Sequence, residues 1–358
     1  MRVLITGCSG YIGSCLSNYL GKKKEVFFLD KKLPKKFMKI KKNFFKCDLN
    51  NLKKTKNIIG KIKPDVIVHL AAKSTVNEKV KKSDYIANNI HATKNLIEVM
   101  NKFGINKIIF SSTAAVYDKS RKLLKENYRL KPISNYGKSK LLAEKEIIDN
   151  KKINFVILRF FNVAGSMNKS SIGEFHDPET HLIPVSVFRA LNDRVINIFG
   201  SNYQTVDGTC VRDYVHVKDI CSAIRRSIFY TKKNKSLVIN IGSGGGTSNK
   251  EVILTLKKII KKKIKTVFLS KRKGDQPVLV CNIEKAKKRL KWKPRFSKIE
   301  NILKDEIKWS KFLIKKKFIR KYLSVQNRKI LLFAFASLDL SRSANRLRRQ
   351  SEMSNYYD

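Results

Sequence analysis

Short apolar runs alternate with segments of helical spacing through the first half of the chain. The runs that predict strands are residues 2–6, 25–29, 65–70, 107–110 and 155–159. Helical patterns run from the glycine loop to about residue 20, and over residues 83–103 and 134–148. Continuous apolar strands that alternate with helices are typical of a doubly wound parallel sheet, so we predict an α/β fold.

A glycine loop with the spacing G-x-x-G-x-x-G joins the first predicted strand to the first predicted helix. In such a loop Gly7 permits the tight turn, Gly10 lets the backbone approach a pyrophosphate, and Gly13 allows close packing of helix on strand. The start of the helix then offers unpaired N–H groups and the positive end of its dipole to phosphates. The loop alone is also compatible with a generic strand-to-helix turn.

Asp30 favours the dinucleotide interpretation of this loop. It lies 23 residues after Gly7, at the end of the second predicted strand, where a carboxylate accepts hydrogen bonds from both ribose hydroxyls. A carboxylate repels a 2′-phosphate, which favours NAD over NADP, and the neighbouring Lys31 and Lys32 weaken this preference slightly.

A tyrosine and a lysine lie one helical turn apart near the start of the helix predicted over residues 134–148. Tyrosine has a pKa of about 10 and is a poor base at neutral pH, but a lysine on the same helical face stabilises its phenolate. Tyr136 and Lys140 have this spacing and follow the hydroxyl-rich sequence Ser111-Ser112-Thr113. In a lysine-rich chain a surface Tyr and Lys recur by chance, so it is the position of the pair that predicts a hydride-transfer site.

Longer motifs point to a family. The most specific is the run D-G-T-C-V-R-D-Y-V-H-V over residues 207–217, followed by R-K-G-D at 272–275 and L-K-W-K-P at 290–294. Together with residues 6–13, 111–117 and 136–140, these stretches resemble the extended short-chain dehydrogenase/reductases, over about residues 1–310. Within that family they are similar to the branch of nucleotide-sugar 4-epimerases. The resemblance implies a Rossmann-like sheet with a smaller C-terminal α/β lobe for the substrate.

The resemblance implies a reaction and a role for each catalytic residue. We expect interconversion of UDP-galactose and UDP-glucose through transient oxidation at the sugar C4, with NAD held as a bound cofactor. Tyr136 is expected to take the proton of the 4-hydroxyl, and Thr113 to hydrogen-bond the same oxygen. Lys140 is expected to hold the nicotinamide ribose and to lower the pKa of Tyr136.

The resemblance also implies contacts for the two ligands. The expected cofactor contacts are Gly7, Gly10, Tyr11, Ile12, Gly13, Asp30, Asp48, Leu49, Asn88, Lys140 and Phe161. The expected substrate contacts are Asn162, Phe199, Arg212, Arg272, Asp275 and Leu279. Two of these have simpler explanations, since Phe199 is compatible with a core aromatic and Asp48 with a strand cap. We expect His69 and His216 to be structural, and we predict no metal site.

An absence separates this chain from the related nucleotide-sugar 4,6-dehydratases. Those enzymes follow the equivalent threonine with an Asp-Glu pair, whereas here Ala114 and Ala115 follow Thr113. Elimination of water then lacks its general acid and base, so we predict epimerisation instead.

The sugar preference rests on one position. In the family a residue two places after the proline of R-x-G-D-x-P limits the sugar pocket, and here it is Leu279. Leucine is intermediate between the large tyrosine of hexose-restricted enzymes and the small residues that admit N-acetyl sugars. UDP-N-acetylglucosamine and UDP-glucuronate therefore remain alternative substrates.

A non-catalytic NAD-sensing or nucleic-acid-binding protein on the same fold is a further alternative. The presence of the Tyr136 and Lys140 pair disfavours it.

Composition changes this picture little. The 358 residues carry a formal charge of +50, mostly from lysines spread along the chain in short runs. Such a spread is typical of an AT-rich genome, so we expect no specific nucleic-acid partner, although the charge attracts anions.

The sequence lacks an apolar run of the ~18 residues that span a bilayer, and we expect that its opening residues are not a signal peptide. The six cysteines lack metal-ligand spacing and are expected to be reduced thiols in a cytoplasmic protein.

We expect three parts along the chain. Residues 1–162 form the NAD-binding domain, with return segments from about 219–241, and residues 163–320 form the nucleotide-sugar lobe. Residues 321–358 are an atypical tail in which arginine replaces lysine, compatible with a lineage-specific extension, a frameshifted reading or a disordered appendix. The resemblance further implies a homodimer through the helices over residues 83–103 and 134–148.

Overall fold

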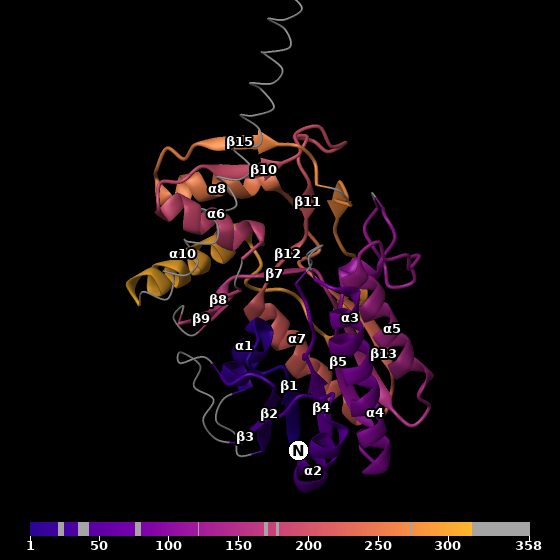
Figure 1. Ribbon diagram of the computed structural model, residues 1–358. Helices are drawn as coiled ribbons and strands as arrows, with labels where there is room; N and C mark the ends of the chain where they lie inside the picture. Colours follow the sequence, from indigo (N-terminus) through magenta and orange to yellow (C-terminus); the bar gives the residue numbers. More distant parts are fainter. Residues whose placement is uncertain are drawn as a thin grey trace, which may run out of the picture.

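A seven-stranded parallel sheet forms the larger lobe of the computed structural model, with the strand order β13-β6-β5-β4-β1-β2-β3 (Figure 1). Its strands are β1 (Val3–Thr6), β2 (Val26–Asp30), β3 (Phe44–Lys46), β4 (Val66–His69), β5 (Lys107–Thr113), β6 (Asn154–Phe160) and β13 (Leu237–Ile241). The structure describes residues 1–20, 25–34, 43–75, 80–120, 122–167, 171–176, 179–272 and 274–316. The predicted doubly wound α/β fold is confirmed.

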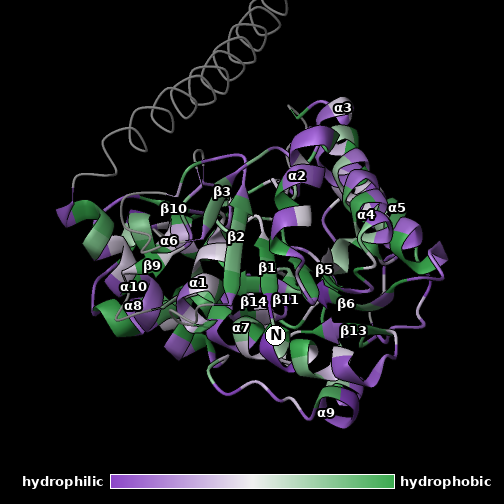
Figure 2. Cartoon of the chain, turned by 90° about the horizontal axis from the view of Figure 1, so that it is seen from below, coloured by the Kyte–Doolittle hydropathy of each residue, from purple (hydrophilic) through white to green (hydrophobic). Residues whose placement is uncertain are grey.

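Helices cover both faces of this sheet (Figure 1). On one face α1 (Tyr11–Leu20) packs against α7 (Val217–Tyr230), and on the other lie α2 (Leu52–Ile62), α4 (Ala92–Lys102) and α5 (Asn135–Asp149). Each helix buries one apolar stripe, with Leu16 and Ile224 in the first core and Leu96 and Ile147 in the second. The strands between them are apolar on both sides, as a sheet covered on both faces requires (Figure 2).

The segment predicted as a single helix over residues 83–103 is divided. It consists of α3 (Lys82–Tyr85), a π-helical turn η1 (Ile86–His91) and then α4. The wider turn carries the buried Asn89, whose Oδ1 accepts from the backbone N of Lys73 at 2.7 Å. Its Nδ2 donates to Ser139 Oγ at 2.8 Å, so the π turn ties the loop after β4 to helix α5.

A segment from the second half of the chain completes the larger lobe. Strand β13 runs parallel to β6 over its full length, and the preceding helix α7 lies beside α1. The short 3-10 turn η3 (Thr231–Lys233) connects the two elements. The boundaries predicted for the two domains stay a prediction.

The smaller lobe stands at one end of the sheet (Figure 1). Its helices are α6 (Leu182–Leu191), α8 (Asn249–Ile260) and α10 (Ile299–Lys315), whereas α9 (Glu284–Leu290) packs against α7 and β13 of the larger lobe. Its strands are β7 (Asn162–Ala164), β8 (Ser166–Met167), β9 (Ile172–Gly173), β10 (Ile196–Phe199), β11 (Val211–Arg212), β12 (Tyr214–His216), β14 (Thr247–Ser248), β15 (Thr266–Leu269) and β16 (Val278–Leu279). Helices α6, α8 and α10 share a core that includes Val187, Leu256 and Ile302.

Two further predictions concern the C-terminal tail and membrane-spanning helices. The tail over residues 321–358 lies outside them, so its nature is not tested. Among the helices that the structure does describe, none combines the length and the apolar character needed to cross a bilayer.

Candidate active site

The predicted catalytic residues and several of the predicted cofactor contacts gather at the carboxyl edge of the parallel sheet. Strand β1 ends at Thr6 before the glycine loop, β5 ends at Thr113, and β6 ends at Phe160 before Phe161 and Asn162. In an open α/β sheet, ligands bind in the crevice outside these strand ends.

The glycine loop leaves no space for side chains at two of its three glycines. A Cβ on Gly13 would lie 2.1 Å from the carbonyl oxygen of Gly7, and one on Gly7 would lie 2.5 Å from the backbone N of Ala71. Gly7 also has a φ of +74°, a conformation that favours glycine. The turn therefore sits tightly against the ends of β1 and β4, and the first N–H groups of α1 have no partner within the helix. This is a cradle of the kind that holds a pyrophosphate.

Asp30 lies beside this cradle at the end of β2. Its Oδ2 accepts from the backbone N of Ser9 at 2.9 Å, and its Oδ1 accepts from that of Lys32 at 2.9 Å. The carboxylate is thus fixed next to the loop where a ribose would follow the pyrophosphate. The residues present fit a dinucleotide.

Lys31 connects two of the other predicted cofactor contacts. Its Nζ lies 3.8 Å from Asp48 Oδ2 and also donates to Asn88 Oδ1. Asp48 in addition accepts from the backbone N of Asn50 at 3.0 Å just after β3, which is compatible with the strand cap that the sequence left open as an alternative. Leu49 is buried in the core beside α2.

Tyr11 and Ile12 anchor the first turn of α1. The Tyr11 hydroxyl donates to the carbonyl oxygen of Gly165, which links the glycine loop to the smaller lobe. Ile12 is partly buried against the core on the α1 face of the sheet. Both residues hold the cradle in position in the described structure.

Helix α5 delivers Tyr136 to the end of β5. Ser134 caps this helix, since its Oγ accepts from the backbone N of Gly137 at 3.0 Å. A Cβ on Gly137 would lie 2.3 Å from the carbonyl oxygen of Ala115, so the helix packs directly on the 3-10 turn η2 (Ala114–Val116) that follows Thr113. This close packing brings the Tyr136 phenol and the Thr113 hydroxyl together.

Burial shifts the pKa values of both members of the predicted catalytic pair. Burial raises the pKa of Tyr136 to about 12, and the nearby Thr113 hydroxyl opposes this increase. Burial lowers the pKa of Lys140 to about 7, against the opposing charge of Glu144. The Lys140 ammonium lies 4.0 Å from the centroid of the Phe110 ring. That Lys140 lowers the pKa of Tyr136 stays a prediction.

A buried polar network beneath the site was not predicted. Arg159 donates to Glu144 Oε2 at 2.7 Å and to the Tyr117 hydroxyl at 3.0 Å, and that hydroxyl donates to Asn240 at 2.6 Å. The signals available in the sequence were an arginine inside an apolar strand and a glutamate four residues after Lys140.

The two histidines expected to be structural occupy buried polar positions. His69 Nδ1 lies 2.7 Å from Thr6 Oγ1, its Nε2 lies 3.1 Å from Thr93 Oγ1, and burial lowers its pKa to about 3. His216 accepts from the backbone N of Lys218 at 3.0 Å, and its Nε2 lies 3.1 Å from Asp305. Both bridge neighbouring elements of the fold.

The predicted substrate residues form two pairs in the smaller lobe. Arg212 Nη2 lies 3.4 Å from Asp275 Oδ1, and the Arg272 guanidinium lies 3.8 Å from the centroid of the Phe199 ring. Phe199 is partly buried, and the Arg272 guanidinium covers one face of its ring.

Leu279 connects these residues to the carboxyl end of the sheet, where Thr113 and Tyr136 lie. It lies opposite Arg212 in the β11–β16 register and packs against an apolar cluster that includes Ala114 and Phe161. Asn162, next to Phe161, opens β7 and pairs there with Tyr214. The two lobes thus meet where the predicted cofactor, catalytic and substrate residues converge.

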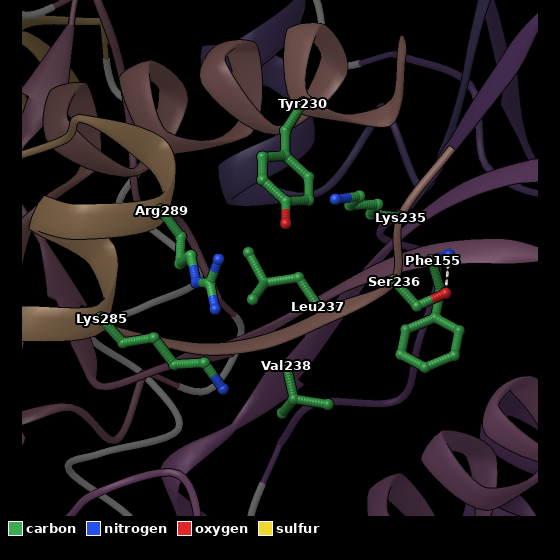
Figure 3. Close-up of a pocket in the computed structure, with 8 residues that line it drawn as sticks. All are labelled: Phe155, Tyr230, Lys235, Ser236, Leu237, Val238, Lys285 and Arg289. Carbon is green, nitrogen blue, oxygen red and sulfur yellow. Dashed lines mark hydrogen bonds between the residues drawn. The ribbon is translucent and has the colours of Figure 1, made fainter. Parts of the chain in front are cut away.

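A separate surface pocket lies at the opposite edge of the sheet. It has a volume of about 480 Å³ and is lined by Phe155, Tyr230, Lys235, Ser236, Leu237, Val238, Lys285 and Arg289 (Figure 3). Phe155 and Leu237 stand at the amino ends of β6 and β13, away from the strand ends that carry the site. None of the predicted site residues lines this pocket.

The fold and the site together define a class. A doubly wound sheet with a glycine cradle, an acidic residue at the end of β2 and a Tyr/Lys pair after β5 is typical of dinucleotide-dependent enzymes of the short-chain dehydrogenase type. The model of the "NAD dependent epimerase/dehydratase family" matches residues 3–242, and the chain belongs to this family.

Known relatives extend the similarity to nearly the whole described chain. A UDP-glucose 4-epimerase of Lacticaseibacillus casei is 38% identical over 321 residues, which cover 86% of this chain and 96% of that protein. The structure of the "UDP-Glc/GlcNAc 4-epimerase" of Campylobacter jejuni is similar with a TM-score of 0.75 at 36% identity, covering 87% of this chain and 99% of that one. That of a UDP-glucose 4-epimerase of Bifidobacterium longum in complex with NAD+ and UDP has a TM-score of 0.80 at 27% identity, covering 87% and 98%.

Proposed function

We propose that this chain is a UDP-glucose 4-epimerase that interconverts UDP-galactose and UDP-glucose with bound NAD. The observation that carries the proposal is the meeting of Thr113 and Tyr136, from the end of β5 and the start of α5, beside the buried Lys140. A family match over residues 3–242 and a UDP-glucose 4-epimerase 38% identical to this chain support it.

The three catalytic side chains divide the chemistry at the sugar C4. Tyr136 takes the proton of the 4-hydroxyl, and the Thr113 hydroxyl positions the same oxygen by a hydrogen bond. The positive charge of Lys140, one helical turn away, favours the phenolate form of Tyr136. When NAD is bound, it supplies the reversible oxidation at C4.

The residues after Thr113 limit the chemistry to this oxidation and its reversal. Ala114 is buried in the apolar cluster that contains Phe161 and Leu279. The backbone carbonyl of Ala115 packs directly against Gly137 of α5. Neither side chain can exchange a proton with the substrate. Elimination of water, which needs a general acid and a base at this point, is therefore disfavoured.

The smaller lobe supplies the groups that suit a uridine diphosphate. We assign the diphosphate to Arg212 and Arg272, because a guanidinium matches phosphate oxygens in two hydrogen bonds. Asp275, 3.4 Å from Arg212, is placed to accept ribose hydroxyls, and Phe199 offers a ring for stacking on the uracil. Asn162 lies between these groups and the catalytic end, and contacts the sugar or the diphosphate.

UDP-N-acetylglucosamine is a second candidate substrate. Leu279 is partly buried beside Ala114 and Phe161, and it is smaller than a tyrosine at the position that limits the sugar pocket. The similar structure from Campylobacter jejuni is that of a UDP-Glc/GlcNAc 4-epimerase. We propose that UDP-galactose is preferred and that the N-acetyl sugar is accepted more slowly.

Assembly and location follow as further parts of the proposal. A homodimer through the α3–α4 and α5 helices is supported by two large apolar side chains, Leu142 and Ile148, that α5 exposes at 46% and 37%. A cytoplasmic location is supported by the six cysteines, all of them free and buried.

The domain division is also part of the proposal. Residues 1–162 are assigned to binding of the cofactor, and residues 163–320 to binding of the nucleotide sugar.

A coupled assay tests the function. Purified protein is incubated with UDP-galactose without added NAD, and UDP-glucose is measured. We expect product, because the cofactor stays bound and is regenerated in each turnover. If protein that releases NAD on denaturation forms no product, the proposed substrate is wrong; UDP-N-acetylglucosamine and UDP-glucuronate then distinguish the alternatives.

A further inference from the structure

Two glutamates and two histidines cluster between strand β9 and helix α6. Glu174 follows β9 directly, His176 comes two residues later, and Glu179 and His181 precede α6 in the spacing E-x-H-x-x-E-x-H. Helix α10 fixes this segment from the side, since Trp309 Nε1 donates to the carbonyl oxygen of Glu174 at 2.7 Å. The cluster therefore lies where β9, α6 and α10 meet.

The four side chains turn their polar atoms toward one another. His181 Nδ1 lies 2.7 Å from Glu179 Oε1 and 3.0 Å from Glu174 Oε1. His176 Nδ1 lies 3.1 Å from Glu174 Oε1 and 3.4 Å from Glu179 Oε2. One ligand atom from each residue falls within 4.8 Å of all the others. In a tetrahedral zinc site with bonds of about 2.0–2.2 Å, neighbouring ligand atoms are about 3.4 Å apart, so small adjustments suffice to enclose an ion.

Three buried polar atoms of this region lack a hydrogen-bond partner among the described residues. They are Glu174 Oε2, His176 Nδ1 and Glu306 Oε2. The Glu174 side chain is 4% exposed, and Glu306, on α10, is 1% exposed. His176 Nδ1 approaches two carboxylates without the alignment of a hydrogen bond. A buried carboxylate oxygen without a partner is costly, and a cation at the centre of the cluster would satisfy that of Glu174.

We propose that Glu174, His176, Glu179 and His181 form a binding site for one divalent transition ion of the Zn²⁺ class. Two imidazole nitrogens with two carboxylate oxygens suit Zn²⁺, whereas Ca²⁺ and Mg²⁺ prefer oxygen ligands alone. Glu306 of α10 adds a buried carboxyl group next to these ligands. The proposal goes beyond the epimerase reaction.

The ion would have a structural role. Four protein ligands close a tetrahedral zinc site, which leaves no open position for chemistry. His181 is the N-cap of α6 and makes no side-chain hydrogen bond to that helix, so its imidazole is available to a metal. The ion would fasten the start of α6 to the segment after β9 and stabilise the smaller lobe. This departs from the prediction of no metal site, which weighed cysteine spacing, His69 and His216.

The competing explanation is a network of ion pairs without a metal. Burial opposes protonation of His176, but the carboxylates of Glu174 and Glu179 raise its pKa to about 9. The charge of Glu174 also raises the pKa of His181 well above its usual value. Protonated imidazoles could then hold the four side chains together, and only metal binding distinguishes the two explanations.

The test uses the full chain after treatment with EDTA. The protein is titrated separately with ZnCl2, CaCl2 and MgCl2, bound metal is measured by mass spectrometry after gel filtration, and the Tm is recorded. We expect one tightly bound zinc per chain, a rise in Tm with zinc, and no comparable effect of calcium or magnesium. His176→Gln and Glu174→Gln should each weaken zinc binding at least tenfold. His91→Gln, which changes an exposed histidine in η1, is the matched control and should bind like the wild type.

The outcomes that would overturn the site are separate from the epimerase assay. If the EDTA-treated wild-type chain binds no zinc and its Tm does not respond, the cluster is an ion-pair network. If zinc binds equally to the wild type and to His176→Gln, the ion lies elsewhere. The wild-type titration decides the first point even if a variant fails to fold.

Discussion

Arg159 and Glu144 form a buried ion pair between β6 and α5, with 2.7 Å between Nη2 and Oε2 and side chains 4% and 1% exposed. Arg159 lies in β6, and Glu144 lies in α5 one turn beyond Lys140. Ser112, next to Thr113 in β5, donates to the same carboxylate. The pair therefore joins α5, β5 and β6, the three elements that carry or border the proposed catalytic residues.

Loss of one partner of this pair should be strongly destabilising. We expect Glu144→Gln to lower the free energy of unfolding by about 3–5 kcal/mol, because it leaves the Arg159 charge buried without a counter-charge. Urea denaturation of the two proteins measures the difference. The double variant Glu144→Leu with Arg159→Met removes both charges and should be more stable than Glu144→Leu alone. A change of less than 1 kcal/mol in Glu144→Gln would mean that the pair is not buried as described.

Removal of the Tyr136 hydroxyl should abolish most of the turnover. We expect kcat of Tyr136→Phe to fall by roughly 10²–10⁴, the range that a positioned acid–base group contributes. Bound NAD and the Tm should stay near the wild-type values, because the phenyl ring remains. Tyr19→Phe, at the far end of α1, is the control for loss of a tyrosine hydroxyl. Full activity of Tyr136→Phe would remove this residue from the reaction.

Lys140 should make stability depend on pH in the NAD-free protein. Burial lowers its pKa to about 7, whereas an unfolded lysine has a pKa of about 10.4. Between these values the unfolded state binds more protons than the folded state, so this group destabilises the fold at low pH and the effect fades as the pH rises.

The Lys140→Met variant isolates that effect. We expect its Tm to exceed the wild-type Tm most at pH 6–7, and the difference to shrink toward pH 10. Lys138→Met changes an exposed lysine on the same helix and should show no such trend. A difference in Tm that stays constant over this range would show that the Lys140 ammonium is not desolvated in the fold.

Leu279 should control the acceptance of N-acetyl sugars. We expect Leu279→Tyr to lower kcat/KM for UDP-N-acetylglucosamine at least tenfold, because the larger ring occupies space that the acetamido group needs. For UDP-galactose the change should stay within about threefold. The ratio of the two kcat/KM values measures this directly, and an unchanged ratio would place the sugar away from Leu279.

Local patterns in the sequence predicted the centre of the site. The glycine loop, Asp30 and the Tyr136–Lys140 pair each depend on spacing along one element and its neighbour, and the strand alternation gave the sheet. The Arg159–Glu144 pair was missed because its partners come from different elements, and nothing in either segment specifies the other. The π turn around Asn89 was missed because the apolar spacing of residues 83–103 also fits an uninterrupted α-helix.

The cluster of Glu174, His176, Glu179 and His181 was missed for another reason. Its residues are close in sequence, but they lie in a segment without strand or helix periodicity, where side-chain direction cannot be derived from spacing. Their approach to Glu306 depends on how α10 packs against β9 and α6. Tertiary packing alone supplies that information.

The fate of the hydrogen at C4 tests the central claim most directly. UDP-galactose deuterated at C4 is converted in ordinary water without added NAD, and the UDP-glucose formed is analysed by mass spectrometry and NMR. Transient oxidation at C4 with a cofactor that never leaves predicts that the deuterium is retained at C4 of the product. Loss of the label to solvent would contradict the account, because it would mean that C4 is inverted by proton exchange instead.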